Sequence, residues 1–282
     1  MVRGLDHLVL PVTSLALARQ RLEALGFSVN KDGIHPFGTS NCCVFVENGV
    51  YLEPLAIHDE ALAAEHAKKN SFVMLDAQFR TNIGNDGLAA LSLQTNDSQA
   101  DREHFTPPYE IGAGHFDFSR KAIHPDGSED ILSVSLTFCM NPSFPNFGLF
   151  TCDWRGDPTV VAKIKTAPAH ANTVVGTIGV DLVSNEIENA LAYLNHGFGA
   201  EFESTGKDRY TLTMPNSHIT LQKGDEPLHA SSVTFSANSL DAVANCLEKA
   251  AISFDSDGEM IEVAPAQGQG VIMKFTEKTK LS

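Results

Sequence analysis

The first fifth of the chain, residues 4–56, decides the fold. It opens with GLDHLVLPV (residues 4–12) and reaches ALGF (residues 24–27) after a mixed polar and apolar stretch. It closes with GTSNCCVFVENGVYLEPLA (residues 38–56). Its apolar runs are separated by Gly26 and by the Asn48-Gly49 pair, which indicates short regular elements.

These elements follow the order strand, helix and three strands. The Leu- and Val-rich run predicts a strand over Leu5–Val12, because branched apolar residues favour a half-buried pleated surface. Residues 13–25 carry apolar side chains at helical spacing, and Gly26 stands where a helix commonly ends. The Asn48-Gly49 pair predicts a tight hairpin. The three strands that follow the helix are expected at Phe27–Asn30, Asn41–Glu47 and Val50–Ile57.

The same order recurs along the rest of the chain with weaker signals. A connecting helix is expected over 59–69, and further strands and helices follow over 87–152. Residues 154–172 carry two prolines without a clear period, which indicates a linker. Strands and helices return over 174–275. The sequence therefore predicts an α+β protein with internal duplication, in two halves at 1–153 and 173–282.

Composition limits the partners of this protein. The chain has 282 residues and a formal net charge of −15, so a nucleic-acid backbone or an anionic membrane surface is an unfavourable partner. The five cysteines are an odd number and form no CxxC pair, which favours reduced thiols. No apolar run has the length of a signal peptide or a membrane span. We therefore expect a cytoplasmic protein.

The quoted stretches resemble the vicinal oxygen chelate superfamily of glyoxalase I, extradiol dioxygenases and bleomycin-resistance proteins. Within it, IHPFGTSN (residues 34–41) followed by YLE (residues 51–53) is most similar to the bacterial glyoxalase-like domain group. The resemblance is specific over 4–57, moderate over 87–154 and weak over 173–275. It implies tandem βαβββ modules, about four in two halves, that form curved mixed sheets around a cup.

The resemblance also implies a metal site. His7 falls on the metal-binding histidine of the first strand, and Glu53 falls on the metal-binding carboxylate of the fourth strand. Imidazole and carboxylate ligands suit Zn, Fe, Ni or Mn. The alternative is a buried polar pair without a metal.

The second module departs from the metal-binding pattern. The corresponding positions fall near Leu88 and at Thr151 or Cys152, of which only a deprotonated Cys152 is a good ligand. A catalytic metal normally has three protein ligands. The standard site is therefore incomplete by sequence.

Several other residues are candidates for the cup. His35, in the loop over 33–38, is a candidate catalytic residue or ligand, and the alternative is packing against its neighbours. Substrate contacts are expected from Phe37, Thr39, Asn41, Arg120 and His170. Arg120 would pair with an anionic substrate, and the alternative is an edge-strand arginine. His170 would reach the cup from the start of the second half, and the alternative is a linker residue.

Two functions follow from these residues. The first is a metal-dependent lyase, isomerase or dioxygenase that acts on a small molecule with vicinal oxygens, with Glu53 as ligand or base. The alternative is a metal-free protein that binds or sequesters a small planar molecule in the same cup. A third interpretation is a duplicated scaffold without chemistry. The expected partner is a small molecule, and a second copy of the chain is a candidate further partner.

Overall fold

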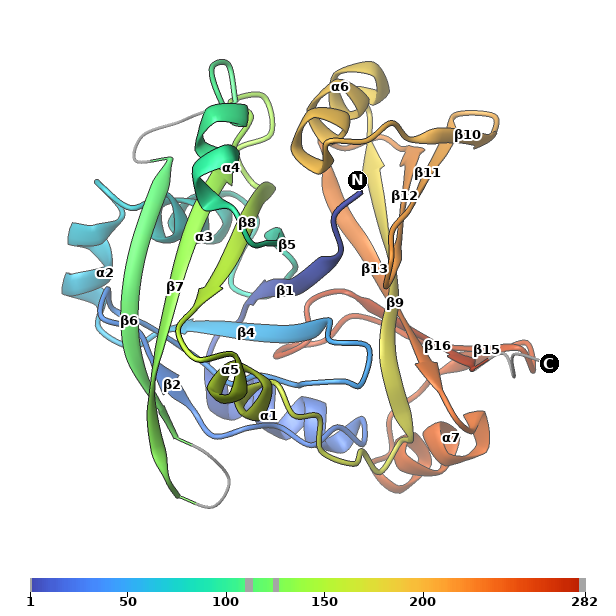
Figure 1. Cartoon of the computed structure of the whole chain (residues 1–282). Coiled ribbons are helices and arrows are strands. Elements are labelled where there is room, and N and C mark those ends of the chain that lie inside the picture. The colour runs from blue at the N-terminus through green and yellow to red at the C-terminus, as the bar shows by residue number, and fades with distance from the viewer. Residues whose placement is uncertain (1, 110–113, 124–126, 279–282) are drawn as a thin grey trace.

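The computed structural model describes residues 2–109, 114–123 and 127–278, and these residues form two eight-stranded mixed sheets (Figure 1). The first sheet consists of β1 (Leu5–Pro11), β2 (Gly33–Ile34), β3 (Thr39–Asn41), β4 (Tyr51–Ile57), β5 (Ala90–Thr95), β6 (His115–Ile123), β7 (Glu129–Cys139) and β8 (Gly148–Arg155). The second consists of β9 (Val174–Ser184), β10 (Glu203–Gly206), β11 (Arg209–Thr213), β12 (His218–Lys223), β13 (His229–Ala237), β14 (Asp255–Ser256), β15 (Met260–Val263) and β16 (Ile272–Glu277).

The strand orders show that each sheet contains two βαβββ modules. The first sheet runs β2-β3-β4-β1-β5-β8-β7-β6, and the second runs β10-β11-β12-β9-β13-β16-β15-β14. In each module the first strand pairs in parallel with the fourth, and the two modules join through an antiparallel pair of first strands. The predicted α+β fold of tandem βαβββ modules in two halves is therefore confirmed.

Seven helices complete the described part of the chain. They are α1 (Leu15–Ala24), α2 (Glu60–His66), α3 (Ser71–Asn82), α4 (Ser98–His104), α5 (Pro158–Ile164), α6 (Ile187–Phe198) and α7 (Leu240–Lys249). Helix α1 begins as expected, because the Ser14 hydroxyl accepts the N–H of Leu17. Helix α5 follows β8 in the chain and lies beside β4 of the first sheet, where Ile164 packs against the apolar cluster that includes Tyr51 (Figure 1).

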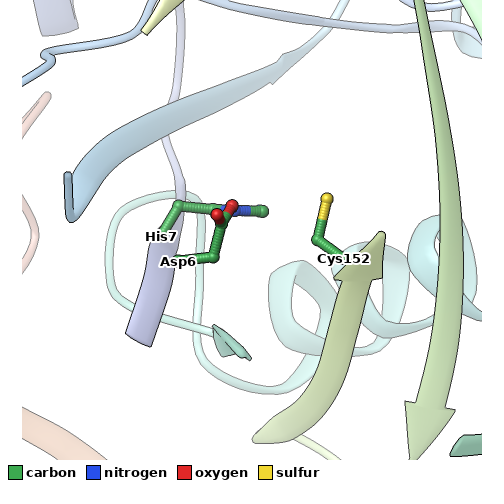
Figure 2. A group of neighbouring side chains, drawn as sticks. All are labelled: Asp6, His7 and Cys152. Carbon is green, nitrogen blue, oxygen red and sulfur yellow. The ribbon is translucent and has the colours of Figure 1, made fainter. Parts of the chain in front are cut away.

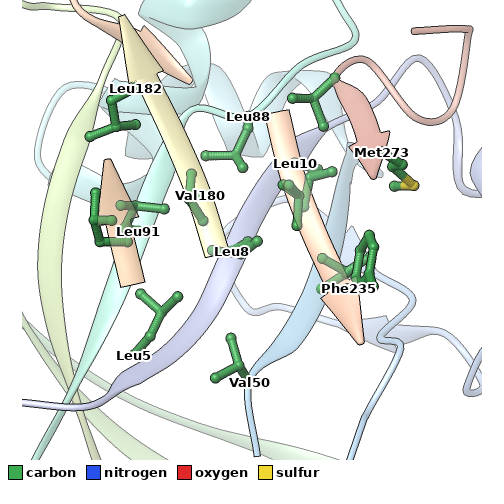
Figure 3. Packing of buried hydrophobic residues seen from close by; sticks show 14 of the residues in the cluster. Leu5, Leu8, Leu10, Val50, Leu88, Leu91, Val180, Leu182, Phe235 and Met273 are labelled. Atoms are coloured by element: carbon green, nitrogen blue, oxygen red, sulfur yellow. The ribbon is translucent and has the colours of Figure 1, made fainter. Parts of the chain in front are cut away.

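The main apolar core lies between the two sheets. Figure 3 shows Leu8 and Leu91 of the first sheet packed with Val180 and Phe235 of the second. Successive strand residues point to opposite faces, so Leu8 and its alternates fill this core while His7 points to the other face of the first sheet. That second face carries a separate apolar cluster around Phe37, Phe138 and Phe150.

Three sequence expectations are wrong in detail. Residues 27–30 form no strand, because the N–H of Asn30 bonds the carbonyl of Cys43 outside any ladder. The strand expected over 41–47 ends at Asn41 and starts earlier, at Thr39, with only an isolated bridge at Val44. Helix α3 was not expected, although Phe72, Leu75 and Phe79 recur along its buried face at helical spacing.

Candidate functional site

A cavity opens on the face of the first sheet that points away from the second sheet. It holds about 520 Å³ of space between its lining atoms, counted to its open mouth. Its walls are apolar and largely aromatic, with Phe37, Phe72 and Phe150 among them. Five polar side chains interrupt these walls, namely His7, His35, Asn41, Glu53 and Arg120. Because apolar walls exclude water, polar contacts among these five groups are stronger than they would be at the surface.

His7 and Glu53 meet at the centre of this cavity. The parallel register of β1 and β4 pairs His7 with Tyr51, so Glu53, two residues further on, points to the same face. His7 Nε2 lies 3.3 Å from Glu53 Oε2, and the two residues are only 3% and 5% exposed. The Tyr51 ring stacks on the imidazole with ring centroids 4.6 Å apart.

Asp6 lies behind His7 and fixes the orientation of its ring. His7 Nδ1 lies 2.7 Å from Asp6 Oδ2, an oxygen that also accepts a hydrogen bond from Trp154 Nε1 at 3.1 Å. Lys165 Nζ contacts the other carboxylate oxygen. Such a carboxylate behind a histidine directs the opposite ring nitrogen toward its partner, here Glu53.

A β-bulge explains how two consecutive residues reach one site. Strand β1 pairs Leu5 with Leu93 but His7 with Ser92, so Asp6 is an extra residue without its own partner on β5. Simple alternation would send Asp6 and His7 to opposite faces, and sequence reasoning missed Asp6 for this reason. Figure 2 shows the two side chains together, with Cys152 of β8 across from them.

The charges of this group are strongly coupled. Burial by itself would lower the pKa of His7, but its hydrogen bonds to Asp6 and Glu53 outweigh burial and raise it. Burial would raise the pKa of Glu53, but the contacts with His7 outweigh burial and lower it. Without a metal, these contacts favour the protonated form of His7 between two ionised carboxylates.

Asn41 and His35 extend the polar chain from Glu53 toward β2. Asn41 Nδ2 donates to Glu53 Oε1 at 2.5 Å and lies 3.3 Å from His35 Nε2. This amide donor assigns the lone pair to Nε2 and the proton to Nδ1, which lies 2.8 Å from Thr39 Oγ1. Burial lowers the pKa of His35 to about 4, so the ring is neutral at neutral pH with Nε2 as acceptor.

The hairpin that carries these residues depends on a glycine. Gly38 has a φ of +89°, and a Cβ there would lie 2.4 Å from the backbone nitrogen of Ala63. Both the left-handed backbone and the close approach of α2 require a residue without a side chain. Gly38 thereby lets the His35 N–H bond the Thr39 carbonyl at 2.9 Å, which sets the turn below the cavity.

The register of β5 and β8 corrects the expected positions of the second module. Ser92 faces His7 across β1 and β5, and Ser92 pairs with Phe150 on β8, so Cys152 is the counterpart of Glu53. Ser92 thus replaces Leu88, which precedes the strand. The Ser92 hydroxyl is fully buried and has no hydrogen-bond partner among the residues that the structure describes. Burial raises the pKa of the Cys152 thiol well above its usual value.

These donors fit a divalent cation. Nitrogen and oxygen ligands about 2.1 Å from one cation lie roughly 3 to 3.4 Å apart, and His7 Nε2 and Glu53 Oε2 have such a spacing. The Ser92 hydroxyl and the Cys152 thiol occupy the positions of the second module that correspond to His7 and Glu53 of the first. Ligand atoms of Asp6, His7 and Cys152 lie within 4.8 Å of one another, but Asp6 already bonds His7, Trp154 and Lys165.

The other expected substrate contacts divide into two groups. Phe37 lines the cavity and stacks on His35 with centroids 4.9 Å apart, and Arg120 lies at its mouth. Thr39 is fully buried behind His35. The structure does not bring His170 to the cavity: its Nδ1 accepts the N–H of Ser28 and its Nε2 donates to the carbonyl of Phe45. His170 joins the linker to the first half instead.

Comparisons with known proteins agree with this fold. A family model described as a glyoxalase-like domain matches residues 5–198. No curated protein matches the sequence at a significant level. A hypothetical protein from Staphylococcus aureus has a similar structure, with a TM-score of 0.73 at 14% identity over 98% of this chain and 100% of that one.

Two further solved structures are similar over nearly the whole chain. A mutant of 4-hydroxymandelate synthase from Streptomyces coelicolor gives a TM-score of 0.54 at 11% identity, covering 99% of this chain and 93% of that one. The Mn(II)-bound glyoxalase from Novosphingobium aromaticivorans gives 0.54 at 12% identity, covering 98% and 82%. At such identities the likeness shows the fold alone. In the described residues, no helix is both long enough and apolar enough to cross a membrane.

Proposed function

We propose, from the premise that this chain belongs to the glyoxalase-like domain family, that it is an enzyme acting on a small molecule with vicinal oxygens. The reaction would take place in the cavity of the first sheet, with a divalent metal held by His7 and Glu53. The observation that carries this proposal is the 3.3 Å spacing of His7 Nε2 and Glu53 Oε2, with Asp6 orienting the imidazole. A Mn(II)-bound glyoxalase among the similar structures supports it.

The bound metal would supply Lewis-acid polarisation of a substrate oxygen. Zn, Fe, Ni and Mn all suit an imidazole and a carboxylate, and the thiol of Cys152 favours the first three. His7 would ligate through Nε2, because its Nδ1 is committed to Asp6. The buried hydroxyl of Ser92 would face the same position.

His35 and Glu53 would move the proton. The lone pair of His35 Nε2 accepts the Asn41 amide at 3.3 Å, and Glu53 Oε1 lies 3.8 Å from that nitrogen. Nε2 would take up a proton when the substrate displaces this amide bond; the carboxylate would then stabilise the imidazolium, and Asn41 would keep its bond to Glu53. Two adjacent proton carriers favour lyase or isomerase chemistry among the reaction classes that the family resemblance implies.

The apolar walls would keep water from this proton transfer. Phe37, Phe118 and Phe72 surround the His35 ring at centroid distances of 4.9, 5.7 and 6.1 Å. Their burial of the ring is also the main cause of its low pKa. His35 would therefore stay unprotonated until it takes a proton from a substrate group that the metal has made more acidic.

Metal analysis of the purified protein tests the proposal. We expect near-stoichiometric metal in the wild-type protein, and its loss in His7→Ala and Glu53→Ala. Asp181→Asn is the control, because Asp181 is a carboxylate of the second sheet that pairs with Lys274 outside the cavity, and this variant should retain the metal. A wild-type protein that stays metal-free after reconstitution, or a His7→Ala variant that keeps its metal, contradicts the proposal.

A metal-free binding protein is the second candidate function. Its support is the second module, where a hydroxyl and a protonated thiol occupy the remaining ligand positions. The Lys165 ammonium group beside Asp6 also supplies a positive charge within this cluster. The imidazolium of His7 between two carboxylates would then be a fixed polar element in the wall of a ligand pocket, and the same metal analysis distinguishes the two functions.

A further inference from the structure

The mouth of the cavity carries a charge that the proposed chemistry does not use. Arg120, on β6, lines both the inner cavity and an outer vestibule of about 1480 Å³ that shares Asn41, Cys43 and Phe45 with it. Strands β2 and β6 are the two edges of the first sheet and come into contact here. The guanidinium group therefore lies where any ligand that passes from the vestibule into the cavity must go.

Arg120 lacks the partners that a structural arginine has. In the described part of the chain, its one hydrogen-bond acceptor is the carbonyl oxygen of Lys121, at 3.1 Å from Nη1. Its Nε is buried without an acceptor, and no carboxylate of the described residues lies within 4 Å. An arginine has five N–H donors, so most of those on Arg120 remain available to an anion.

The backbone beneath Arg120 leaves room for the guanidinium group. A Cβ on Gly33 would lie 2.8 Å from Arg120 Nη1 and 2.7 Å from Asn41 Oδ1. A larger residue would therefore push the arginine away from the mouth or displace the Asn41 amide. Gly33 thus permits a close approach that places the charge next to the polar chain of the site.

The vestibule is positive in a protein that is strongly negative overall. Among its described lining residues, Lys31, Arg120, Lys121 and Lys163 are cationic and Asp32 is the one acidic residue. Lys121 pairs with Glu129 at 2.7 Å, and Asp32 pairs with Arg19 at 2.6 Å. Against a net charge of −15, this local reversal would attract anions to the mouth and repel cations.

We propose that the ligand of the cavity is a planar, apolar carboxylic acid, with its carboxylate on Arg120 and its apolar body between the aromatic walls. This inference uses the proposed function only in taking the cavity as the binding site. A planar body fits because Phe37, Phe45, Phe72, Phe118 and Phe150 present ring faces and edges to the space. A carboxylate fits because a guanidinium fork binds it through two parallel hydrogen bonds.

Trp154 provides a direct test. It is the single tryptophan of the chain and lines the cavity, so its fluorescence reports binding there. The probes are phenylacetate and phenylacetamide, which have nearly the same shape and differ by one negative charge. We expect the wild-type protein to bind phenylacetate about ten-fold more tightly than phenylacetamide. Arg120→Met should remove this preference by weakening phenylacetate alone.

Two further variants make the result specific. Arg120→Lys should keep part of the preference, because a lysine supplies the charge without the planar fork. Lys249→Met is the control: this lysine is exposed at the end of α7 in the second half and lines neither the cavity nor the vestibule. It should leave the preference unchanged. Unaltered phenylacetamide binding by Arg120→Met shows that the cavity of this variant is intact.

Equal affinity of both probes for the wild-type protein overturns the inference, as does the absence of quenching by either probe. A preference that survives in Arg120→Met overturns it as well. Metal content is measured on the same samples, so the two proposals fail separately. A metal-free protein can still prefer phenylacetate through Arg120, and a metalloprotein can show no such preference.

Discussion

The two sheets have the same topology but place different chemistry at the same point. In the first sheet, His7 pairs with Ser92 on one side and with Tyr51 on the other. In the second sheet, Gly179 pairs with Thr234 and with His218 in the same way, and both His7 and Gly179 stand seven residues before the N-cap of the next helix. Gly179 is therefore the counterpart of His7 on β9.

The remaining positions follow from the same registers. Thr220 stands two residues beyond His218 and is the counterpart of Glu53, while Thr276, two residues beyond Lys274, is the counterpart of Cys152. Two residues beyond Gly179, Asp181 Oδ2 bonds Lys274 Nζ at 2.9 Å and accepts the Ser232 hydroxyl at 2.6 Å. The second sheet thus has a glycine and a threonine in place of His7 and Glu53, beside a closed ion pair.

This difference shows what distinguishes the candidate site from its scaffold. The ammonium of Lys274 satisfies Asp181 within the second sheet, and the position of His7 is a glycine there. In the first sheet His7 faces a carboxylate, the counterpart of Thr276 is a thiol, and the Ser92 hydroxyl has no hydrogen-bond partner among the described residues. One fold therefore supports a self-contained polar cluster in one half and an unsatisfied donor set in the other.

The strongest test of this difference compares the stability lost when the central residue of each polar cluster, His7 or Asp181, is truncated to alanine. His7→Ala should lower the free energy of unfolding by about 3–5 kcal/mol, because it leaves two buried carboxylates without their shared partner. Asp181→Ala should cost only about 1 kcal/mol, because its ion pair with Lys274 is partly exposed and solvent screens it. Urea unfolding of chelator-treated protein gives both values without a contribution from bound metal. Equal losses in the two variants would show that the clusters are equivalent.

The fold was largely predictable because its signals are local. Apolar runs, the glycine after the first helix and the Asn48-Gly49 turn locate elements that recur in four modules. The N–H of Gly49 bonds the carbonyl of Val46, as a turn there requires. Helix α3 was missed, although Phe72 and Phe79 recur at helical spacing in the sequence. The irregular course of residues 27–30 could not be predicted locally, because it depends on a contact with Cys43.

The site was predictable only where strand alternation holds. His7 and Glu53 came from the resemblance to the glyoxalase-like group, and the structure brings them together with His35, Asn41 and Arg120. Asp6 could not be placed, because a bulge is a property of the pairing between two strands. Ser92 was missed for the same reason: register between distant strands fixes which residue faces His7. The hydrogen bonds that commit His170 to the linker are likewise absent from any local pattern.

Acid should destabilise the first half through His35. The folded protein keeps this ring neutral down to about pH 4, whereas the unfolded chain protonates it near the ordinary pKa of 6.5. Below that ordinary value the unfolded state binds more protons, so stability falls as the pH falls toward 4. His35→Gln should remove about 2 kcal/mol of the loss between about pH 7 and pH 5.

Urea unfolding at the two pH values measures this effect in chelator-treated protein. His218→Gln on β12 of the second sheet is the control and should lose as much stability as the wild-type protein on acidification. If His35→Gln shows the same acid loss as the wild-type protein, the buried His35 ring is protonated in the fold and does not serve as the neutral acceptor described above.

The smallest effect is expected at Lys274. Lys274→Met removes an ammonium group whose side chain is 23% exposed and which bonds Asp181 at the centre of the second sheet. Exposed or partly exposed ion pairs contribute about 0–1 kcal/mol, so the free energy of unfolding should change by less than about 1 kcal/mol. Added salt should reduce even this difference, because it screens the pair. The variant should also gain no metal, since the counterparts of His7 and Glu53 in the second sheet are Gly179 and Thr220, which supply no imidazole and no carboxylate. A loss of several kcal/mol, or the appearance of bound metal, would mean that the lysine alone separates the second sheet from the first, and that the two halves share one latent site.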